Sequence, residues 1–386
     1  MRNECGTKVN MAIQRLRAYN FFYFSILSMF ISFLPIYLTH RGISPAELGL
    51  LVGVGSFIGI LSQPFWGMLS DRAKTIKRII LLTVGFSVAI GFLLFTSSQF
   101  SILFLLVAAM YFFLMPTDPL TESLNYRIAE DNKISFGSIR TYGAIGFASS
   151  SLVIGWMVDV WGMDSLAWLY LTFGTLTFAI CLFVPDAPAS KNKLSFQELK
   201  QFFFYPRTLR FFLLVLLAST PHRTNDSFLG VYVQSLGGST GDVGQAWFLA
   251  AISEVVFFAI SARLLQRWSE IRLITTAAVL YTIRYVLCAL APSADWVVYL
   301  QITQGITFVI FYTASIQYLY RIIPEEWKAT GQTVLAVLFF GLSGIVGSIA
   351  GGWVFQMLGG SYLYWAMAFF SFAAFLYSLF LEKRSI

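Results

Sequence analysis

Two opposite charges lie in apolar surroundings in the first half of the chain. Glu122 and Arg140 stand on either side of a short charged loop, and the sequence that flanks this loop is apolar enough to cross a bilayer. An ionised group in the hydrocarbon core is costly unless it pairs with an opposite charge or faces water. The two residues therefore predict a polar site inside a membrane, where a carboxylate and a guanidinium bind the polar part of a small solute.

A second carboxylate precedes this pair. Asp118 lies one helical turn before Glu122, so the two side chains share one face of a helix. Pro116 and Pro119 interrupt the hydrogen bonding of that helix, which membrane spans tolerate. Asp118 either contributes to the solute site or accepts hydrogen bonds from backbone donors that the prolines leave free, and the sequence leaves both interpretations open.

Further ionisable residues lie inside apolar segments of the second half. His222 and Arg223 both come within one helical turn of Asp226, so they can meet its carboxylate. Because histidine titrates near neutral pH, His222 and Asp226 are candidates for proton coupling. Alternatively, Arg223 and Asp226 form an internal pair that only lowers the cost of insertion. Glu254 and Arg284 occupy the next two apolar segments and are predicted to link solute binding to protonation.

The composition indicates which elements must carry these residues. Of 386 residues, 57% are hydrophobic and only 12% are charged, and the mean hydropathy is +0.72, values that no soluble domain of this size requires. A helix needs about 20 apolar residues to cross a bilayer, and about twelve segments qualify. They are 19–39, 46–69, 79–96, 102–125, 137–160, 166–184, 209–234, 244–265, 273–290, 296–320, 331–357 and 362–380.

A polar connection, 185–208, divides these segments into an N-terminal six-helix bundle (1–184) and a C-terminal six-helix bundle (209–386). Residues 195–204 within it are predicted to form a short amphipathic helix on the membrane surface. Nearly all of the 26 Lys and Arg residues fall on one side of the membrane if both termini are cytoplasmic, which explains the net charge of +7 without nucleic acid. The sequence thus predicts an all-α, multi-pass protein of the cell (cytoplasmic) membrane with both termini in the cytoplasm.

The loop after the second segment carries a motif. Its sequence, WGMLSDRAKTIKR, presents Gly67, Asp71, Arg72, Lys77 and Arg78 in an order that resembles the loop after the second helix of the major facilitator superfamily. The resemblance implies two six-helix bundles around a central cavity that opens to each side of the membrane in turn. It also implies a conformational role for this loop, in which Asp71 caps a neighbouring helix or pairs with a basic residue.

The stretch around Glu122 and Arg140 resembles the lactose permease branch of this superfamily and the related phenylpropionate and nucleoside:proton symporter groups. In that branch a Glu of the fourth helix and an Arg of the fifth helix pair in the solute site, and the resemblance implies the same role for these two residues. Phe147 replaces the stacking tryptophan of the permease. An aromatic face remains for the solute, but the indole N–H donor is lost.

The resemblance also bears on the proton route. Glu254 and Arg284 match the site carboxylate of the eighth helix and the arginine of the ninth helix in that branch. Gln304, however, replaces a histidine, and Thr307 replaces the proton-bearing glutamate of the permease. Gln304 can still hydrogen-bond a polar solute. Protons must then bind at one of the other buried carboxylates, or transport is uncoupled.

The sequence therefore predicts a secondary active transporter that moves a small organic solute (a sugar, a nucleoside or an aromatic acid) by alternating access and proton symport. Tyr23 and Tyr312 are expected to add apolar or stacking contacts. The alternatives are proton-driven efflux of amphipathic compounds, which the aromatic content of 17% favours, and a non-transporting membrane sensor. We expect a monomer whose partners are the solute, protons and membrane lipid. We expect no enzymatic activity, cofactor, metal site or nucleic-acid partner.

Overall fold

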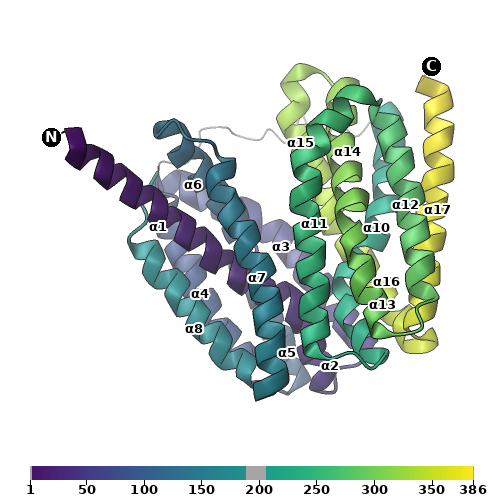
Figure 1. Ribbon diagram of the computed structural model, residues 1–386, viewed down its shortest axis with the longest axis horizontal. Helices are drawn as coiled ribbons and strands as arrows, with labels where there is room; N and C mark the ends of the chain where they lie inside the picture. Colours follow the sequence, from purple (N-terminus) through teal and green to yellow (C-terminus); the bar gives the residue numbers. More distant parts are fainter. Residues whose placement is uncertain (1, 188–205, 386) are drawn as a thin grey trace. The chain divides into compact units, whose positions relative to one another are not determined.

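Helices account for the regular structure of the chain (Figure 1). The computed structural model describes residues 2–187 and 206–385, and no strand occurs within these ranges. Most of the predicted linker, 185–208, lies outside the described residues, as does the amphipathic helix predicted for 195–204. The all-α prediction is confirmed.

The helical elements follow one another through short connections. Up to residue 187 they are α1 (Arg2–Ser28), the π-helical turn η1 (Met29–Phe33), α2 (Leu34–His40), α3 (Pro45–Ala73), α4 (Lys77–Leu94), α5 (Phe100–Phe113), α6 (Thr117–Asp131), α7 (Gly137–Trp161) and α8 (Ser165–Leu182). From residue 206 onward they are α10 (Pro206–Ser235), α11 (Thr240–Arg267), α12 (Glu270–Ala289), α13 (Ala294–Leu300), η2 (Gln301–Thr303), η3 (Gly305–Val309), α14 (Ile310–Ile322), η4 (Glu325–Trp327), α15 (Lys328–Ala336), η5 (Val337–Leu342), α16 (Ser343–Leu358) and α17 (Gly360–Ser385).

These elements form two compact units. Among the described residues, unit 1 contains 2–43, 54–187 and 243–248, and unit 2 contains 44–53, 206–242 and 249–385. Unit 1 thus combines helices of the first half with a short segment of α11, and unit 2 combines helices of the second half with the beginning of α3.

Eleven helical segments in the described ranges are long and apolar enough to cross a membrane. The remaining predicted span corresponds to α10, a continuous helix whose middle reads STPHRTNDS and includes Pro221. These polar residues lower the hydropathy of α10 without interrupting the helix. With α10 added, the order of the helices follows that of the predicted segments, so the chain is a multi-pass membrane protein.

The predicted span 102–125 is broken near its prolines. α5 ends at Phe113, and α6 begins at Thr117, directly after Pro116. Proline is tolerated at the start of a helix because the first backbone N–H groups have no partner within the helix. The interruption therefore lies just before the helix that carries the predicted solute-binding carboxylates.

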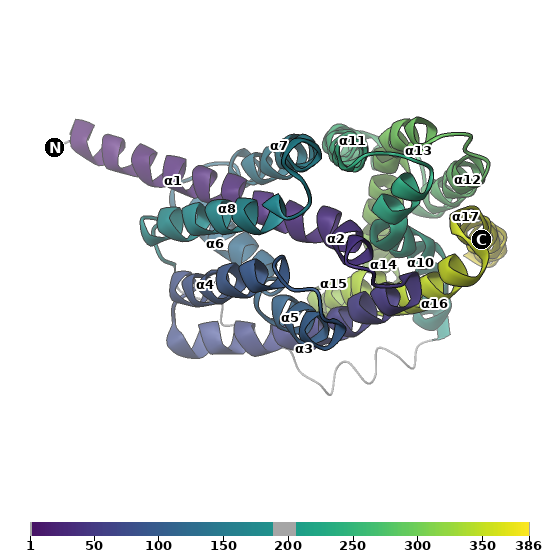
Figure 2. The same cartoon turned by 90° about the horizontal axis from the view of Figure 1, so that it is seen from below.

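In unit 1, α1 lies along α7 and also contacts α8 (Figures 1 and 2). Gly146 of α7 permits the close approach, because a Cβ atom at this position would overlap the backbone carbonyl of Phe21 in α1. Near this crossing, the buried hydroxyls of Ser28 and Ser151 lie 2.8 Å apart and join the two helices. The α1–α7 pair is thereby held at short range around the residues that build the site.

In unit 2, α10 lies along α16 and α17 and is joined to α16 in a similar way. The hydroxyls of Ser227 and Ser348 lie 2.8 Å apart, as in the serine pair of unit 1. α7 and α16 also end alike, at Gly162 and Gly359, whose φ angles of +84° and +91° are accessible to glycine without strain. The serine contact between the first and fifth spans is therefore repeated between the seventh and eleventh, and the fifth and eleventh spans end alike.

A buried amide pair holds α6 against α1. Asn20 and Asn125 are fully buried, and each side-chain amide donates to the carbonyl of the other, at 2.8 and 2.7 Å. We expect Asn125→Ala to lower the free energy of unfolding by about 1–3 kcal/mol, because the Asn20 carbonyl loses its donor in a dry environment. Thermal unfolding in detergent micelles measures this loss. Asn132→Ala is the matched control, since Asn132 bonds to a carbonyl of its own helix, and equal losses in both variants would contradict the prediction.

Candidate functional site

The predicted carboxylate–guanidinium pair is formed in unit 1. Glu122 of α6 and Arg140 of α7 make an ion pair through Oε1 and Nε, and their side chains are 27% and 37% exposed. The Arg140 guanidinium also lies 4.1 Å from the centroid of the Phe24 ring of α1, a cation–π contact. Three helices therefore orient this guanidinium. Its two terminal nitrogens make no hydrogen bond to the described residues, so they remain available as donors to a ligand.

Asp118 lies one turn before Glu122 on α6, as expected. Its Oδ1 atom is buried and has no hydrogen-bond partner among the described residues, so the alternative of a structural hydrogen bond is not realised at this atom. The hydroxyl of Tyr23 is also buried and unpartnered in the described part of the chain. Tyr23 lies within electrostatic range of both Asp118 and Glu122. An unused acceptor and an unused donor therefore lie near the ion pair.

Phe147 follows Arg140 by two helical turns on α7. Its ring meets that of Trp247 edge-on, with centroids 6.1 Å apart, and Trp247 belongs to the segment of α11 that is part of unit 1. The indole N–H of Trp247 is buried and has no acceptor within the described ranges. An indole donor thus lies next to the phenylalanine that replaces a tryptophan, and sequence reasoning missed it because the two residues are far apart in the chain.

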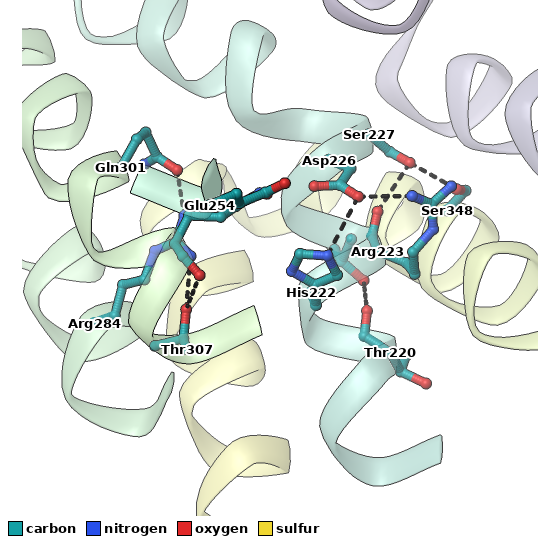
Figure 3. Close-up of polar contacts among 12 residues, drawn as sticks. Thr220, His222, Arg223, Asp226, Ser227, Glu254, Arg284, Gln301, Thr307 and Ser348 are labelled. Carbon is teal, nitrogen blue, oxygen red and sulfur yellow. Dashed lines mark hydrogen bonds and ion pairs between the residues drawn. The ribbon is translucent and has the colours of Figure 1, made fainter. Parts of the chain in front are cut away.

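In unit 2, the guanidinium of Arg284 is held by neutral side chains. Arg284 of α12 is only 2% exposed. Its Nη2 atom donates to Oε1 of Gln301, and its Nη1 atom lies 3.4 Å from Oγ1 of Thr307 (Figure 3). The same Nη2 atom donates to Oε1 of Gln304 at 2.8 Å. The Nε2 atom of Gln304 in turn donates to Oε1 of Glu254 on α11, at 3.1 Å. Gln304 therefore bridges the guanidinium and the carboxylate that were predicted to act together.

A π-helical turn places Gln304 in this bridge. The turn η3 begins at Gly305, whose backbone N–H donates to Oγ of Ser253 at 2.9 Å. Ser253 directly precedes Glu254, so this contact sets the tenth span against the carboxylate. π-helical turns within α-helices are frequent at functional sites. Solute binding by Gln304 stays a prediction, and both ends of its amide have protein partners in this structure.

Three ionisable side chains meet on α10 (Figure 3). Nη1 of Arg223 donates to Oδ2 of Asp226 at 2.7 Å, and Nε2 of His222 lies 3.7 Å from the same oxygen. The His222 ring is 3% exposed and stacks on Phe308 of η3, with centroids 4.7 Å apart and planes inclined by 2°. The internal Arg223–Asp226 pair is therefore present. His222 approaches the same carboxylate oxygen as Arg223 does.

Tyr312 lies in an aromatic cluster of unit 2. Its ring stacks on Phe308 at 5.6 Å between centroids and meets Phe339 and Phe340 of η5 at 5.2 and 5.4 Å. The expectation that Tyr312 contacts the solute stays a prediction. The cluster itself was not foreseen, because phenylalanine is common throughout the apolar segments and its position alone is uninformative.

The motif loop joins α3 and α4 at an exposed surface. The Asp71 side chain is exposed and has no hydrogen bond or ion pair with any described residue. Asp186 caps the start of α4 instead, because its carboxylate accepts from Oγ1 of Thr75 at 2.5 Å and from the backbone N–H of Lys77 at 3.0 Å. The other motif residues are Gly67 and Arg72 on α3 and Arg78 on α4. Sequence reasoning missed Asp186, although an acid directly after an apolar segment was the available signal.

Proteins of similar sequence are transporters. The profile described as "MFS_1 like family" matches residues 13–366. A maltose permease from Geobacillus stearothermophilus is 24% identical over 368 residues, which cover 92% of this chain and 92% of the relative. A probable 3-phenylpropionic acid transporter from Escherichia coli (strain K12) is 26% identical over 356 residues, which cover 90% of this chain and 92% of the relative.

A solved structure of similar fold is the crystal structure of the nucleoside transporter NupG. It superposes with a TM-score of 0.86 at 17% sequence identity and covers 96% of this chain and 99% of its own. At this level of identity the likeness shows the fold. The fold expected from the sequence is therefore confirmed.

Proposed function

The chain belongs to the MFS_1 like family and is a transporter of the MFS type, and we propose that it moves a small organic solute across the cytoplasmic membrane by proton symport and alternating access. The similar proteins are a maltose permease, a probable 3-phenylpropionic acid transporter and a nucleoside transporter. Maltose, phenylpropionic acid and nucleosides all combine a ring with polar oxygen atoms. We assign the solute to this class: a sugar, a nucleoside or an aromatic acid.

The observation that carries this proposal is the Glu122–Arg140 pair in the spans of unit 1. The free terminal nitrogens of Arg140 can donate to a hydroxyl or a carboxylate, and Glu122 can accept from a hydroxyl. Asp118 and Tyr23 add an unused acceptor and an unused donor nearby. Phe147 offers an aromatic face to the ring of the solute. This set of groups suits a ligand that is polar on one side and apolar on the other.

Proton coupling is assigned to the bridge in unit 2. Glu254 binds and releases the transported proton on its carboxylate, and the buried charge of Arg284 favours the ionised form of Glu254. Gln304 positions the two groups, because its carbonyl can only accept from the guanidinium and its amide nitrogen can only donate to the carboxylate. The bridge supports coupling even though Gln304 and Thr307 themselves carry no titratable proton.

The remaining features of the proposal follow from the same family. Two six-helix bundles, 1–184 and 209–386, would move against each other, joined by 185–208, with both termini cytoplasmic and the loop around Asp71 contributing to the conformational change. The working form is a monomer in membrane lipid, and the chain needs no cofactor. Uptake is the direction we propose, and export of amphipathic compounds or a sensor that binds without transport are the competing outcomes.

The experiment measures solute-driven pH changes in lightly buffered, de-energised cells that express the protein. Sugars, nucleosides and aromatic acids are added in turn, and cells without the protein serve as the control. We expect one class to make the medium more alkaline, because each solute molecule that enters carries a proton with it. Uptake of labelled solute without a pH change would contradict proton symport. Extrusion of the solute from energised cells would favour export, and binding without flux would favour a sensor.

A further inference from the structure

We propose that His222 and Asp226 of α10 form a second proton-binding site in unit 2, distinct from Glu254. The role of this site in transport rests on the proposed function, but the existence of the site does not. The site would bind a proton on an imidazole nitrogen of His222, with the Asp226 carboxylate as its counter-ion, and release it unchanged, so no other bond forms or breaks. It would supply a buried proton acceptor in a chain in which Gln304 and Thr307 replace titratable residues of the permeases that it resembles.

The geometry leaves both residues with unused capacity. Oδ2 of Asp226 accepts from Nη1 of Arg223 at 2.7 Å, but its Oδ1 atom is buried without a partner among the described residues. Nδ1 of His222 is likewise buried and unpartnered in that part of the chain, and Nε2 lies 3.7 Å from Asp226 Oδ2. This distance is too long for a hydrogen bond but short enough for an ion pair. Protonation would turn both ring nitrogens into donors and the contact into a charged pair.

Burial and the charges on two helices determine when His222 holds a proton, and burial of the ring, which is 3% exposed, opposes the charged form. On α10, Asp226 favours the charged imidazole, and Arg223 opposes it. On α12, Tyr281 contributes an uncharged ring at 6.0 Å, and Arg284 opposes the charged form. The ring of Phe308, from η3, stacks on the imidazole, and a ring face attracts a cation stacked on it, whereas the uncharged ring of Phe339, from η5, is inclined by 52°. Asp226 and the Phe308 ring therefore favour a proton on His222, whereas burial of the imidazole and the two guanidinium groups oppose it.

Arg284 connects this site to the Glu254 bridge. The same guanidinium repels a proton on His222 and is joined through Gln304 to Glu254. When Glu254 is ionised, its negative charge offsets part of the Arg284 charge, and a proton on His222 is easier to hold. When Glu254 binds a proton, that offset disappears, and a proton on His222 is disfavoured. The two sites would therefore disfavour double occupancy, so that a proton gained at one favours release from the other.

A change of charge at His222 would affect the tenth and eleventh spans, because both contact its ring. Its ring stacks on Phe308 of η3 and lies 5.6 Å from Phe339 of η5, and Arg223 lies 5.8 Å from the ring of Phe340 in the same turn. Both turns are π-helical, and such turns are places where a membrane helix departs from regular geometry and bends. A proton gained or lost at His222 changes the attraction between these rings and the cations beside them.

The test follows the two histidines of the chain, His40 and His222, by NMR of imidazole-labelled full-length protein in lipid nanodiscs. The His222 signals are those lost in His222→Gln. We expect them to change from neutral to charged imidazole as the pH is lowered from about 8 to about 4, the range in which a perturbed histidine titrates. His222 signals that stay neutral throughout, or stay charged throughout, would overturn the proposal.

Two variants test the assignment with opposite signs. At a fixed pH in the titration range, Asp226→Asn should lower the ratio of charged to neutral His222 about tenfold, and Arg223→Gln should raise it by a similar factor. A merely structural disturbance would not act in opposite directions, and His40 should not respond to either variant. Equal ratios in all three proteins would overturn the site. The measurement needs no solute, so failure of the solute panel would count against symport and not against this site.

Discussion

Replacement of Arg140 by lysine is expected to lower the kcat/KM for solute uptake about 100-fold, which corresponds to about 3 kcal/mol of lost stabilisation. Lysine keeps the positive charge, but it has neither the planar fork that binds an oxygen pair nor the flat surface that lies on the Phe24 ring. A compact ammonium ion would pair with Glu122 alone and leave no oriented donors for the solute. Initial rates of labelled solute uptake in proteoliposomes measure the effect.

The matched control is Arg17→Lys. Arg17 also lies on an aromatic ring, that of Tyr142 at 5.2 Å, and its Nε donates to the carbonyl oxygen of Ser138 at 3.2 Å, but it has no carboxylate partner among the described residues. Both arginines join α1 and α7, so both variants change the same helix pair. We expect uptake by Arg17→Lys to stay within about twofold of the unmodified protein, because lysine keeps the charge of this partly buried side chain and no ion pair is lost. Uptake by Arg140→Lys at the same level would contradict the assignment of Arg140 to the solute site.

The Glu122–Arg140 pair could be predicted because charge inside a membrane is costly. Two opposite charges in apolar spans are expected to face the interior of the protein and to pair, and the structure brings them together. Phe24 carried no such information, because one phenylalanine among many in an apolar helix cannot be distinguished from the others. Its contact with Arg140 depends on how closely α1 approaches α7, which Gly146 permits through backbone packing that spans several turns.

The bridge from Glu254 through Gln304 to Arg284 in unit 2 is a second feature that the sequence did not predict. Glu254, Arg284 and Gln304 were each found as polar residues in apolar segments, but no contact of Gln304 with either charged residue was predicted. A π-helical turn begins at Gly305, directly after Gln304, and the Gln304 amide lies between the two charges. No local pattern predicts such a turn, because the extra residue in the turn is accommodated by packing against α11.

The fold was largely predictable because hydropathy and proline act locally. The break before α6 follows from Pro116, and the helices follow the apolar segments in order. The cap on α4 was not predicted, since the motif directed attention to Asp71, whereas the carboxylate in contact is that of Asp186 from the end of the sixth span. A contact between residues distant in the chain needs the packing of whole helices, which a motif does not specify.

Glu254→Gln is expected to abolish the alkalinisation that accompanies solute uptake, to below about a tenth of the unmodified value, while solute exchange across the membrane persists. Glutamine has nearly the same shape and keeps an oxygen that can accept from Nε2 of Gln304, so the bridge to Arg284 remains. It cannot bind or release a proton, so net uptake loses its coupled ion. Exchange of internal for external solute needs no change of protonation and therefore separates coupling from binding.

Glu270→Gln is the matched control for this variant. Glu270 also lies in unit 2 and pairs with Arg321 at 2.9 Å, but it is the first residue of α12 rather than a residue in the middle of a span. Removal of its charge should therefore leave both alkalinisation and exchange unchanged. If alkalinisation survives in Glu254→Gln, the coupling group must be another buried carboxylate, and Glu122 and Asp226 become the candidates. If exchange is lost as well, Glu254 takes part in solute binding itself. Only loss of alkalinisation with retained exchange places the transported proton on Glu254, because no other result separates the proton from the solute at this residue.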